Sequence, residues 1–337
     1  MIGVSNVWKT YKKNGIKINA LQNVDFYVEH GEIFGIIGKQ GAGKSTLIRL
    51  LSLFEKPTTG GLSISGKSFE KCSRKELQQI RQQIGIVSGN FHLLWSRTVS
   101  ENITFSLELA GFSQAKISKR LDEVLDIVSL QGREDHYPAN LPPHLKLRVS
   151  IARALAHEPK LLLCDDPTAH LDFQTSEDIL RLLSKINQEF GLTLVIASQQ
   201  LAPIQRICQQ VIILDEGKMV ESGSLDQIFM NPKHFVTKRF IREATGEEEA
   251  HHLFSQLLGS SPESKVVHLK YGSDTAHLPL ISEVVRTFSV NINIIHGKTL
   301  QNQKGGNVSV FIQISGAGLN DALTFLTQSG IQLEVIN

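Results

Sequence analysis

Residues 38–45 read Gly-Lys-Gln-Gly-Ala-Gly-Lys-Ser, and this stretch decides the fold of the chain. It follows a short, unbroken apolar run at residues 33–37 and precedes a helical pattern at residues 46–54. Glycines at this spacing let backbone N–H groups turn inward around a phosphate, and the next helix presents its positive end to the same anion. A buried strand, a glycine-rich loop and a helix in this order predict the opening of a P-loop α/β fold.

The same loop predicts a nucleotide site. The lysine of such a loop, here Lys44, neutralises the β- and γ-phosphates of ATP, and the hydroxyl of Ser45 ligates Mg²⁺. A second apolar run, at residues 161–164, ends at Asp165 and places a carboxylate where it can hold the same Mg²⁺. A chance turn and a capping aspartate are the simpler alternatives, but the combination favours ATP and Mg²⁺ as cofactors. The loop residues expected to bind ATP are Gly38, Gly41, Ala42, Gly43, Lys44, Ser45 and Thr46.

The composition limits the classes of protein that this chain can be. Its 337 residues suffice for two domains, and 35 basic and 33 acidic residues balance to a net charge of +2, which gives no support for nucleic-acid binding. The three cysteines lack metal-ligand spacing and indicate reduced thiols of a cytosolic protein. The first residues lack a signal-peptide core, and no apolar run reaches about 18 residues. Any membrane role is therefore expected to come through a partner.

The pattern of apolar runs and turns divides the chain. Within residues 1–243, short buried runs alternate with helical patterns, which predicts a mostly parallel sheet with crossover helices and an antiparallel N-terminal part. Residues 244–262 begin with a polar, charged stretch and are expected to form a linker. Residues 263–337 predict the order βαββαβ of a ferredoxin-like domain. Its expected strands and helices are residues 265–271, 280–288, 290–296, 308–314, 318–328 and 331–336.

With these motifs in place, the first 240 residues resemble the ATP-binding cassette (ABC) family, and specifically the ATPases of methionine importers. Residues 148–155 (RVSIARAL) resemble the helix that follows the signature sequence of the family. Residues 166–172 (DPTAHLD) resemble the end of the Walker B motif and the D-loop. Residues 91–99 (FHLLWSRTV) resemble the segment that meets the membrane subunit, and Tyr11 stands where the family stacks an aromatic ring on adenine.

Residues 288–295 (FSVNINII) resemble part of the small regulatory domain of methionine-importer ATPases, so the resemblance covers both predicted domains. It implies a subunit that couples ATP binding and hydrolysis to uptake of an amino acid, methionine being expected, through a membrane permease. The implied partners are a second copy of the chain, the permease and a substrate-binding protein. The implied location is peripheral, at the cytoplasmic face of the inner membrane. In the family the regulatory domain senses an amino acid, and bound methionine slows transport.

Four positions tied to hydrolysis depart from the family pattern. Residues 141–145 read Leu-Pro-Pro-His-Leu in place of Leu-Ser-Gly-Gly-Gln, and proline has no N–H to donate to a phosphate. Gly89 replaces a glutamine, and Gln199 replaces a histidine that contacts the γ-phosphate. Asp166 replaces the catalytic glutamate and has a shorter side chain. Asp166 and Gln199 thus hold the catalytic positions, and we expect hydrolysis to be slow or nearly absent.

Two other functions fit parts of the sequence. A degenerate cassette could bind nucleotide, or an amino acid through its C-terminal domain, and act as a regulatory subunit with little ATPase activity. A soluble cassette protein of ribosomes or DNA repair is disfavoured, because such proteins usually carry tandem cassettes or coiled coils and this chain has one cassette and no long heptad run. ATP turnover in the presence of the membrane partner would separate the transport ATPase from the regulatory subunit.

Overall fold

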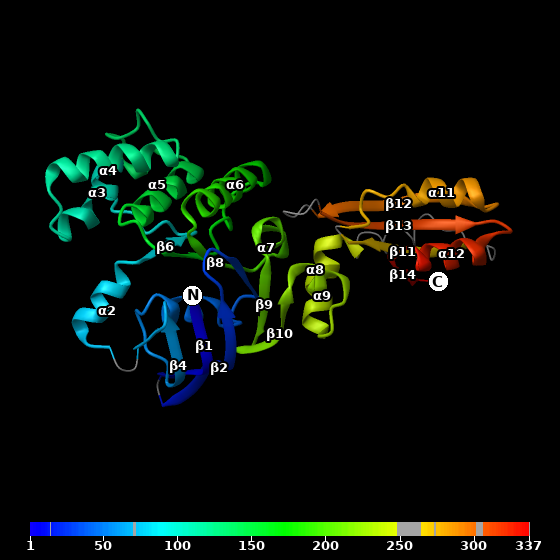
Figure 1. Ribbon diagram of the computed structural model, residues 1–337, viewed down its shortest axis with the longest axis horizontal. Helices are drawn as coiled ribbons and strands as arrows, with labels where there is room; N and C mark the ends of the chain where they lie inside the picture. The colour runs from blue at the N-terminus through cyan, green and yellow to red at the C-terminus, as the bar shows by residue number, and fades with distance from the viewer. Residues whose placement is uncertain (14, 70–71, 248–263, 273, 301–305, 337) are drawn as a thin grey trace. The chain divides into compact units, whose positions relative to one another are not determined.

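The chain folds into two compact units, Met1–Ser222 and Gly223–Asn337 (Figure 1). The computed structural model describes residues 1–336 except 14, 70–71, 248–263, 273 and 301–305. The expected linker at residues 244–262 lies for the most part outside the described residues, so the predicted domain limits stay predictions. Within the described part of the chain, no helix is long and apolar enough to cross a membrane.

The larger sheet of the first unit is built from buried parallel strands. Its order is β10-β9-β3-β8-β7-β6, and β9, β3, β8, β7 and β6 pair in parallel. Every residue of β3 and β8 is buried, which explains why these strands are apolar in the sequence except for Thr193 and Ser198 at the two ends of β8. The strands span Ile33–Ile37 (β3), Ile84–Ser88 (β6), Leu161–Asp165 (β7), Thr193–Ser198 (β8), Gln210–Asp215 (β9) and Lys218–Ser224 (β10).

Helices cover this sheet as crossovers between its strands. α1 packs on β7 and β8, whereas α7 packs on β3 and β8. α5 packs on β6 and contacts α3 and α4, and Figure 1 shows these three helices gathered at one end of the unit. α2 and α3 each begin with a capping box, at Ser73 and Thr98. The helices span Lys44–Leu51 (α1), Arg74–Arg81 (α2), Val99–Leu109 (α3), Gln114–Ile127 (α4), Pro143–Leu155 (α5), Phe173–Phe190 (α6) and Leu201–Ile207 (α7).

A second sheet of the first unit has the order β2-β1-β4-β5 and pairs its strands antiparallel. Val7 and Leu21 of this sheet share one core cluster with Leu47 of α1 and Leu163 of β7. The strands span Ile2–Lys13 (β1), Ile16–Val28 (β2), Thr59–Ile64 (β4) and Lys67–Ser68 (β5). The predicted fold class is therefore confirmed, including the antiparallel N-terminal part.

The second unit contains a four-stranded antiparallel sheet whose chain order and strand order are those of a ferredoxin-like domain. The sheet order is β12-β13-β11-β14, and α11 and α12 follow the first and third of its strands along the chain. Val267 and Ile312 of the sheet form a core with Val284 and Leu326 of the two helices. The elements span Leu225–Met230 (α8), Phe235–Thr245 (α9), Ser264–Tyr271 (β11), Leu280–Thr287 (α11), Asn291–Leu300 (β12), Asn307–Ser315 (β13), Leu319–Gln328 (α12) and Gln332–Val335 (β14).

Candidate nucleotide-binding site

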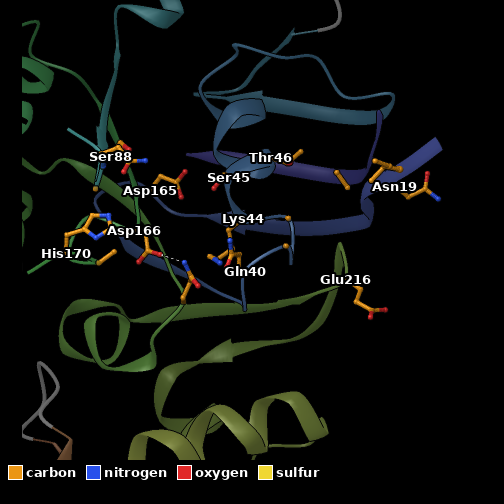
Figure 2. Close-up of a pocket in the computed structure, with 18 residues that line it drawn as sticks. Asn19, Gln40, Lys44, Ser45, Thr46, Ser88, Asp165, Asp166, His170 and Glu216 are labelled. Atoms are coloured by element: carbon orange, nitrogen blue, oxygen red, sulfur yellow. Dashed lines mark hydrogen bonds between the residues drawn. The ribbon is translucent and has the colours of Figure 1, made fainter. Parts of the chain in front are cut away.

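A cavity of about 620 Å³ lies beside the phosphate loop (Figure 2). Its walls come from β2, the loop and α1, the segments that follow β6, β7 and β8, and the turn between β9 and β10. The carboxyl ends of parallel strands meet here, where open α/β sheets bind their ligands. Figure 2 shows Lys44 near the middle, with Asn19 and Glu216 toward one end and Asp166 and His170 toward the other.

Gly43 lets the chain pass directly from the loop into α1. Its φ of 104° lies in the left-handed region, and a Cβ there would lie 2.6 Å from the carbonyl oxygen of Ala20. α1 begins at Lys44, two residues earlier than the sequence pattern predicts, because this glycine makes the turn. A Cβ at Gly217 would lie 2.8 Å from the same Ala20 oxygen, and the Gly217 N–H donates to the carbonyl of Ala42 (3.1 Å). The strand β2, the loop and the β9–β10 turn therefore meet backbone to backbone.

Most of the loop residues expected to bind ATP line the cavity, but two lie behind it. At Gly38 a Cβ would lie 2.7 Å from the carbonyl oxygen of Leu214, so the loop presses against the end of β9. Ala42 is buried. These two residues shape the loop without facing the cavity. The expected residues that do line it are Gly41, Gly43, Lys44, Ser45 and Thr46.

The ammonium of Lys44 is held at the inner wall of the cavity. Its Nζ donates to the carbonyl oxygens of Gly38 (2.7 Å) and Lys39 (3.1 Å). Burial lowers the pKa of Lys44, and the charges of Asp166 and Asp165 oppose this shift. A buried cation of this kind suits an anionic ligand, which would supply the opposite charge and a further hydrogen-bond acceptor.

Ser45 and Asp165, the expected Mg²⁺ ligands, are brought together. Asp165 ends β7, and the Ser45 hydroxyl donates a hydrogen bond to its carboxylate. Burial raises the pKa of Asp165, and the neighbouring Asp166 charge adds to the shift. The hydrogen bond from Ser45 and the cations Lys44 and Arg49 oppose it. Hydroxyl and carboxylate oxygens suit Mg²⁺, which takes further ligands from water and phosphate, so these residues fit the ion.

Asp166 and Gln199, at the expected catalytic positions, are hydrogen-bonded to each other. Nε2 of Gln199 donates to Oδ2 of Asp166 (2.9 Å), and Oγ of Ser198 donates to Oδ1 (3.3 Å). The backbone of Asp166 has a left-handed φ of 48°, and its N–H donates to the carbonyl of Ala197 (2.8 Å). A Cβ at Gly89 would lie 2.4 Å from the Asp166 carbonyl oxygen. This backbone conformation therefore excludes a side chain at position 89.

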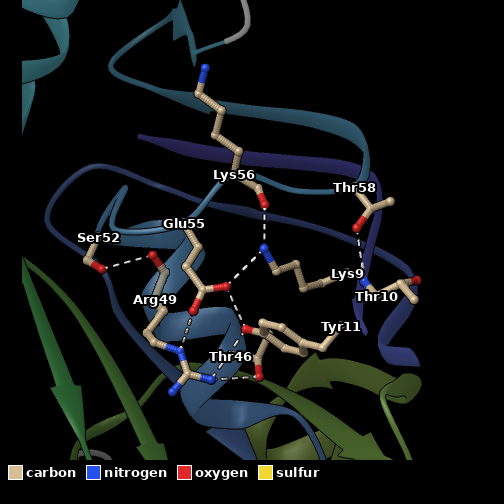
Figure 3. Close-up of polar contacts among 9 residues, drawn as sticks. All are labelled: Lys9, Thr10, Tyr11, Thr46, Arg49, Ser52, Glu55, Lys56 and Thr58. Carbon is tan, nitrogen blue, oxygen red and sulfur yellow. Dashed lines mark hydrogen bonds and ion pairs between the residues drawn. The ribbon is translucent and has the colours of Figure 1, made fainter. Parts of the chain in front are cut away.

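Tyr11 is not among the residues that line the cavity. Its hydroxyl donates to Oε2 of Glu55 (2.6 Å), and Nζ of Lys9 lies 2.9 Å from the same oxygen and 5.0 Å from the centre of the Tyr11 ring (Figure 3). Nε of Arg49 lies 3.0 Å from the other Glu55 oxygen, and its Nη2 donates to Oγ1 of Thr46 (3.2 Å). Lys9, Tyr11, Arg49 and Glu55, here called the Glu55 cluster, thus tie the ring to the cavity wall at Thr46.

The Glu55 cluster also fixes the charge of its central carboxylate. Burial is the largest single influence and raises the pKa of Glu55, whereas hydrogen bonds from Tyr11 and Lys9 lower it. The positive charges of Lys9 and Arg49 act in the same direction, so the pKa of Glu55 is lowered overall. Stacking of the Tyr11 ring on adenine stays a prediction.

Pro142 and Pro143 stand at the start of α5. Pro142 is the N-cap residue, without a side-chain capping bond, and the helix begins at Pro143. Neither residue has a backbone N–H, and the N–H groups of Leu145 and Lys146 donate to the Pro142 carbonyl (3.1 Å each). The helix start therefore offers fewer amides to a phosphate than a Ser-Gly-Gly sequence would.

Several cavity residues were missed by the sequence patterns: Asn19, Ser88, His170 and Glu216. They belong to segments far apart in the sequence, and only the sheet topology brings them to one place. His170 carried the strongest available signal, because an imidazole lies inside the segment 166–172 that resembles the D-loop.

Comparisons with known proteins identify the family of this chain. The ABC transporter family matches residues 21–169, and the NIL domain matches residues 265–335. The methionine import ATP-binding proteins MetN of Geobacillus kaustophilus and Bacillus subtilis are each 42% identical over 100% of this chain and 99% of their own length. A solved ATP-binding cassette, a dimer in a post-hydrolysis state bound to ADP and Pi, is 34% identical with a TM-score of 0.62 and covers 67% of this chain and 99% of that chain. This chain therefore belongs to the ABC transporter family, as an ATP-binding subunit of the methionine import type.

Proposed function

We propose that this chain binds ATP with Mg²⁺ in the cavity beside the phosphate loop and hydrolyses it to drive methionine uptake through a membrane permease. The observation that carries the proposal is the convergence of Lys44, Ser45 and Asp165 on one cavity, with Asp166 at its far end. The proposed assembly contains two copies of the chain, the permease and a substrate-binding protein. Its proposed location is the cytoplasmic face of the inner membrane, where the chain is peripheral.

Each residue of the predicted site has a part in this proposal. Lys44 and the loop N–H groups bind the phosphates, and Ser45 and Asp165 hold Mg²⁺, which when bound neutralises the β- and γ-phosphates. Asp166 accepts a hydrogen bond from the attacking water, and Gln199 fixes the orientation of its carboxylate. The other residues proposed to contact or shape the nucleotide site are Tyr11, Gly38, Gly41, Ala42, Gly43 and Thr46.

We also propose that hydrolysis is slow. The Asp166 carboxylate reaches less far than that of a glutamate and is bonded to Gln199, and a catalytic group misplaced by about 1 Å loses roughly a hundredfold in rate. Pro142 and Pro143 offer no N–H to the ATP of a partner copy, and losing one preorganised donor costs about 10²–10³-fold. Such losses are not additive, but they act in one direction. The alternative of a purely regulatory cassette finds no support in the comparisons.

Reconstitution of the full chain with its permease in vesicles tests both parts of the proposal. Methionine uptake should require ATP, with a kcat below the ordinary range of ~1–10³ s⁻¹. An ordinary kcat would contradict slow hydrolysis alone, whereas uptake that ignores ATP would contradict the transport function.

For the second unit, we propose a linker at residues 244–262 and a regulatory domain at residues 263–337 that pairs with its copy and binds a small apolar amino acid such as methionine. The ferredoxin-like strand order and the NIL match support the proposal, since small domains of this kind often bind ligands or dimerise. A purely dimerising domain is the alternative, and a ligand titration separates the two.

A further inference from the structure

His170 lies at the end of the cavity that holds the two carboxylates. It belongs to the segment between β7 and α6, and it lines the cavity together with Asp165 and Asp166. Figure 2 shows its imidazole on the same side as Ser88 and Asp166, away from Asn19. A nucleotide whose base lies at the Asn19 end and whose phosphates follow the loop would point its last phosphate toward this group.

The segment that carries His170 is held in place at both ends. Near Asp166, the N–H of Ala169 donates to the Asp166 carbonyl (3.3 Å), and the N–H of Leu171 donates to the Thr168 carbonyl (3.2 Å). At the other end, Asp172 caps α6 by accepting from the N–H of Thr175 (2.9 Å). These bonds fix the backbone on either side of the imidazole, so His170 is presented to the cavity by an ordered turn.

The side chains at the family's catalytic positions at this end of the cavity are engaged or missing, whereas Ser88 and Asn90 line it as neutral polar groups. The amide of Gln199 donates to Asp166, and position 89 has no side chain. The Lys44 ammonium donates to two carbonyl oxygens of the loop. Among the described residues that line the cavity, the basic side chains are Lys44 and His170. His170 is therefore the basic side chain at this end of the cavity, whereas Lys44 is hydrogen-bonded to the backbone of the loop.

The negative charge at this end of the cavity also favours a hydrogen-bond donor that can contact the phosphate. Asp165 and Asp166 are acidic, and a terminal phosphate adds negative charge beside them. Hydrogen bonds from a nitrogen donor to a phosphate oxygen are charge-assisted and about twice as strong as neutral ones. An imidazole can supply such a bond in either protonation state, because neutral histidine keeps one N–H.

We propose that His170 donates a hydrogen bond to the terminal phosphate of the bound nucleoside triphosphate. The inference rests on the proposed function, because it requires ATP to occupy this cavity. It assigns the phosphate contact to a residue of the segment after β7, while Gln199 serves Asp166. A diphosphate, which ends one group earlier, does not reach His170.

The test compares two nucleotides on the purified full chain. Calorimetric titrations with Mg²⁺ and either ADP or the non-hydrolysable β,γ-imido analogue of ATP give both dissociation constants. His170→Ala should weaken the analogue about tenfold and leave ADP within twofold. His170→Gln, which keeps an N–H donor of similar reach, should recover part of the loss. His30→Ala, which removes an exposed imidazole outside the cavity, is the matched control and should change neither constant.

The outcomes distinguish a failure of the His170 contact from a failure of the proposed ATP binding on which it rests. A natural chain that binds neither nucleotide would overturn the proposed function and this inference with it. A natural chain that binds both, combined with an unchanged analogue affinity in His170→Ala, would overturn only the inference. An equal loss for ADP and the analogue would also overturn it, because it would show a structural role in the cavity wall and no contact specific to the last phosphate.

Discussion

The carbonyl oxygen of Asp166 occupies the space into which a side chain at Gly89 would extend. The separation from an ideal Cβ is 2.4 Å, well inside contact distance, and Asp166 holds its position through the bond from its N–H to Ala197. The absence of a side chain at position 89 therefore fits the backbone position of Asp166. Restoring a side chain at position 89 without moving Asp166 is sterically excluded.

Substitution at Gly89 should disturb this fit and cause a loss of stability. Gly89→Ala forces the Asp166 backbone to shift, and overpacking of this kind costs about 1–3 kcal/mol of unfolding free energy. Urea denaturation of the full chain measures it. Gly297→Ala is the matched control, because a Cβ there meets no atom within 4 Å. Equal stability of the two variants would show that the Asp166 turn yields without cost.

Removal of the Lys44 ammonium should abolish ATP binding. Lys44→Ala deletes the cation that the loop directs at the β- and γ-phosphates. Equilibrium titration with a fluorescent ATP analogue provides the measurement, and Lys39→Ala, an exposed lysine of the same loop, serves as control. Retention of natural affinity in Lys44→Ala would refute the assignment of the phosphate site.

Restoring the residues of the family pattern should accelerate hydrolysis. The combined variant carries Asp166→Glu, Gln199→His, Pro142→Ser, Pro143→Gly and His144→Gly. It lengthens the catalytic carboxylate and returns amide donors to the start of α5, so we expect at least ~10-fold faster turnover, or ~1.4 kcal/mol of transition-state stabilisation. A phosphate-release assay on the permease complex measures this rate. Because Asp166 and Gln199 are bonded to each other, Asp166→Glu alone should recover less than the pair. A combined variant no faster than the natural chain would mean that other residues limit the rate.

The Glu55 cluster should contribute stability that acid removes. The pKa of Glu55 is lowered in the folded chain, so its ionised form is favoured there over the unfolded chain. The contribution is therefore present above the ordinary value of 4.5 and is lost as pH falls through the lower folded pKa. At pH 7, Glu55→Gln should cost about 0.5–1 kcal/mol, as for a partly exposed ion pair, and less near pH 3. Denaturant titrations at both pH values measure the difference, and Tyr11→Phe should lose only part of it. A cost in Glu55→Gln that is independent of pH would contradict this account.

Methionine should bind to the full chain through its second unit. Calorimetry with millimolar methionine should detect heat at a stoichiometry of one ligand per chain, and serine, a polar amino acid, should give none. A cavity of about 240 Å³ in this unit is lined mainly by apolar side chains, among them Leu278, Ile281 and Val310, and such a lining suits an apolar ligand side chain. Absence of heat with methionine would leave dimerisation as the function of the domain.

The parts of the fold that follow from local pattern were predictable, and the parts of the site that depend on topology were not. β3 and β8 are buried on both faces, so their largely apolar sequences predict them as strands. The glycines of the loop predict the turn into α1. The start of α1 was misplaced by two residues, because the apolar pattern does not reveal that Gly43, with its positive φ, is the N-cap residue. Asn19 and Glu216 gave no local signal at all, since β2 and the β9–β10 turn meet only through tertiary contacts. The placement of Tyr11 likewise depends on Glu55, which lies 44 residues away along the chain.

The backbone junction of Ala20, Gly43 and Gly217 makes one end of the cavity rigid. The three segments approach one another through backbone atoms, and the Gln22 N–H donates to the Gly217 carbonyl (2.7 Å), so they cannot slide past one another without breaking contacts. For a nucleotide that rests its base against this edge, as proposed, ATP and ADP differ in how far their phosphates extend along the cavity. We then expect ATP to make contacts that ADP lacks at the far edge, where Asp166 and His170 lie.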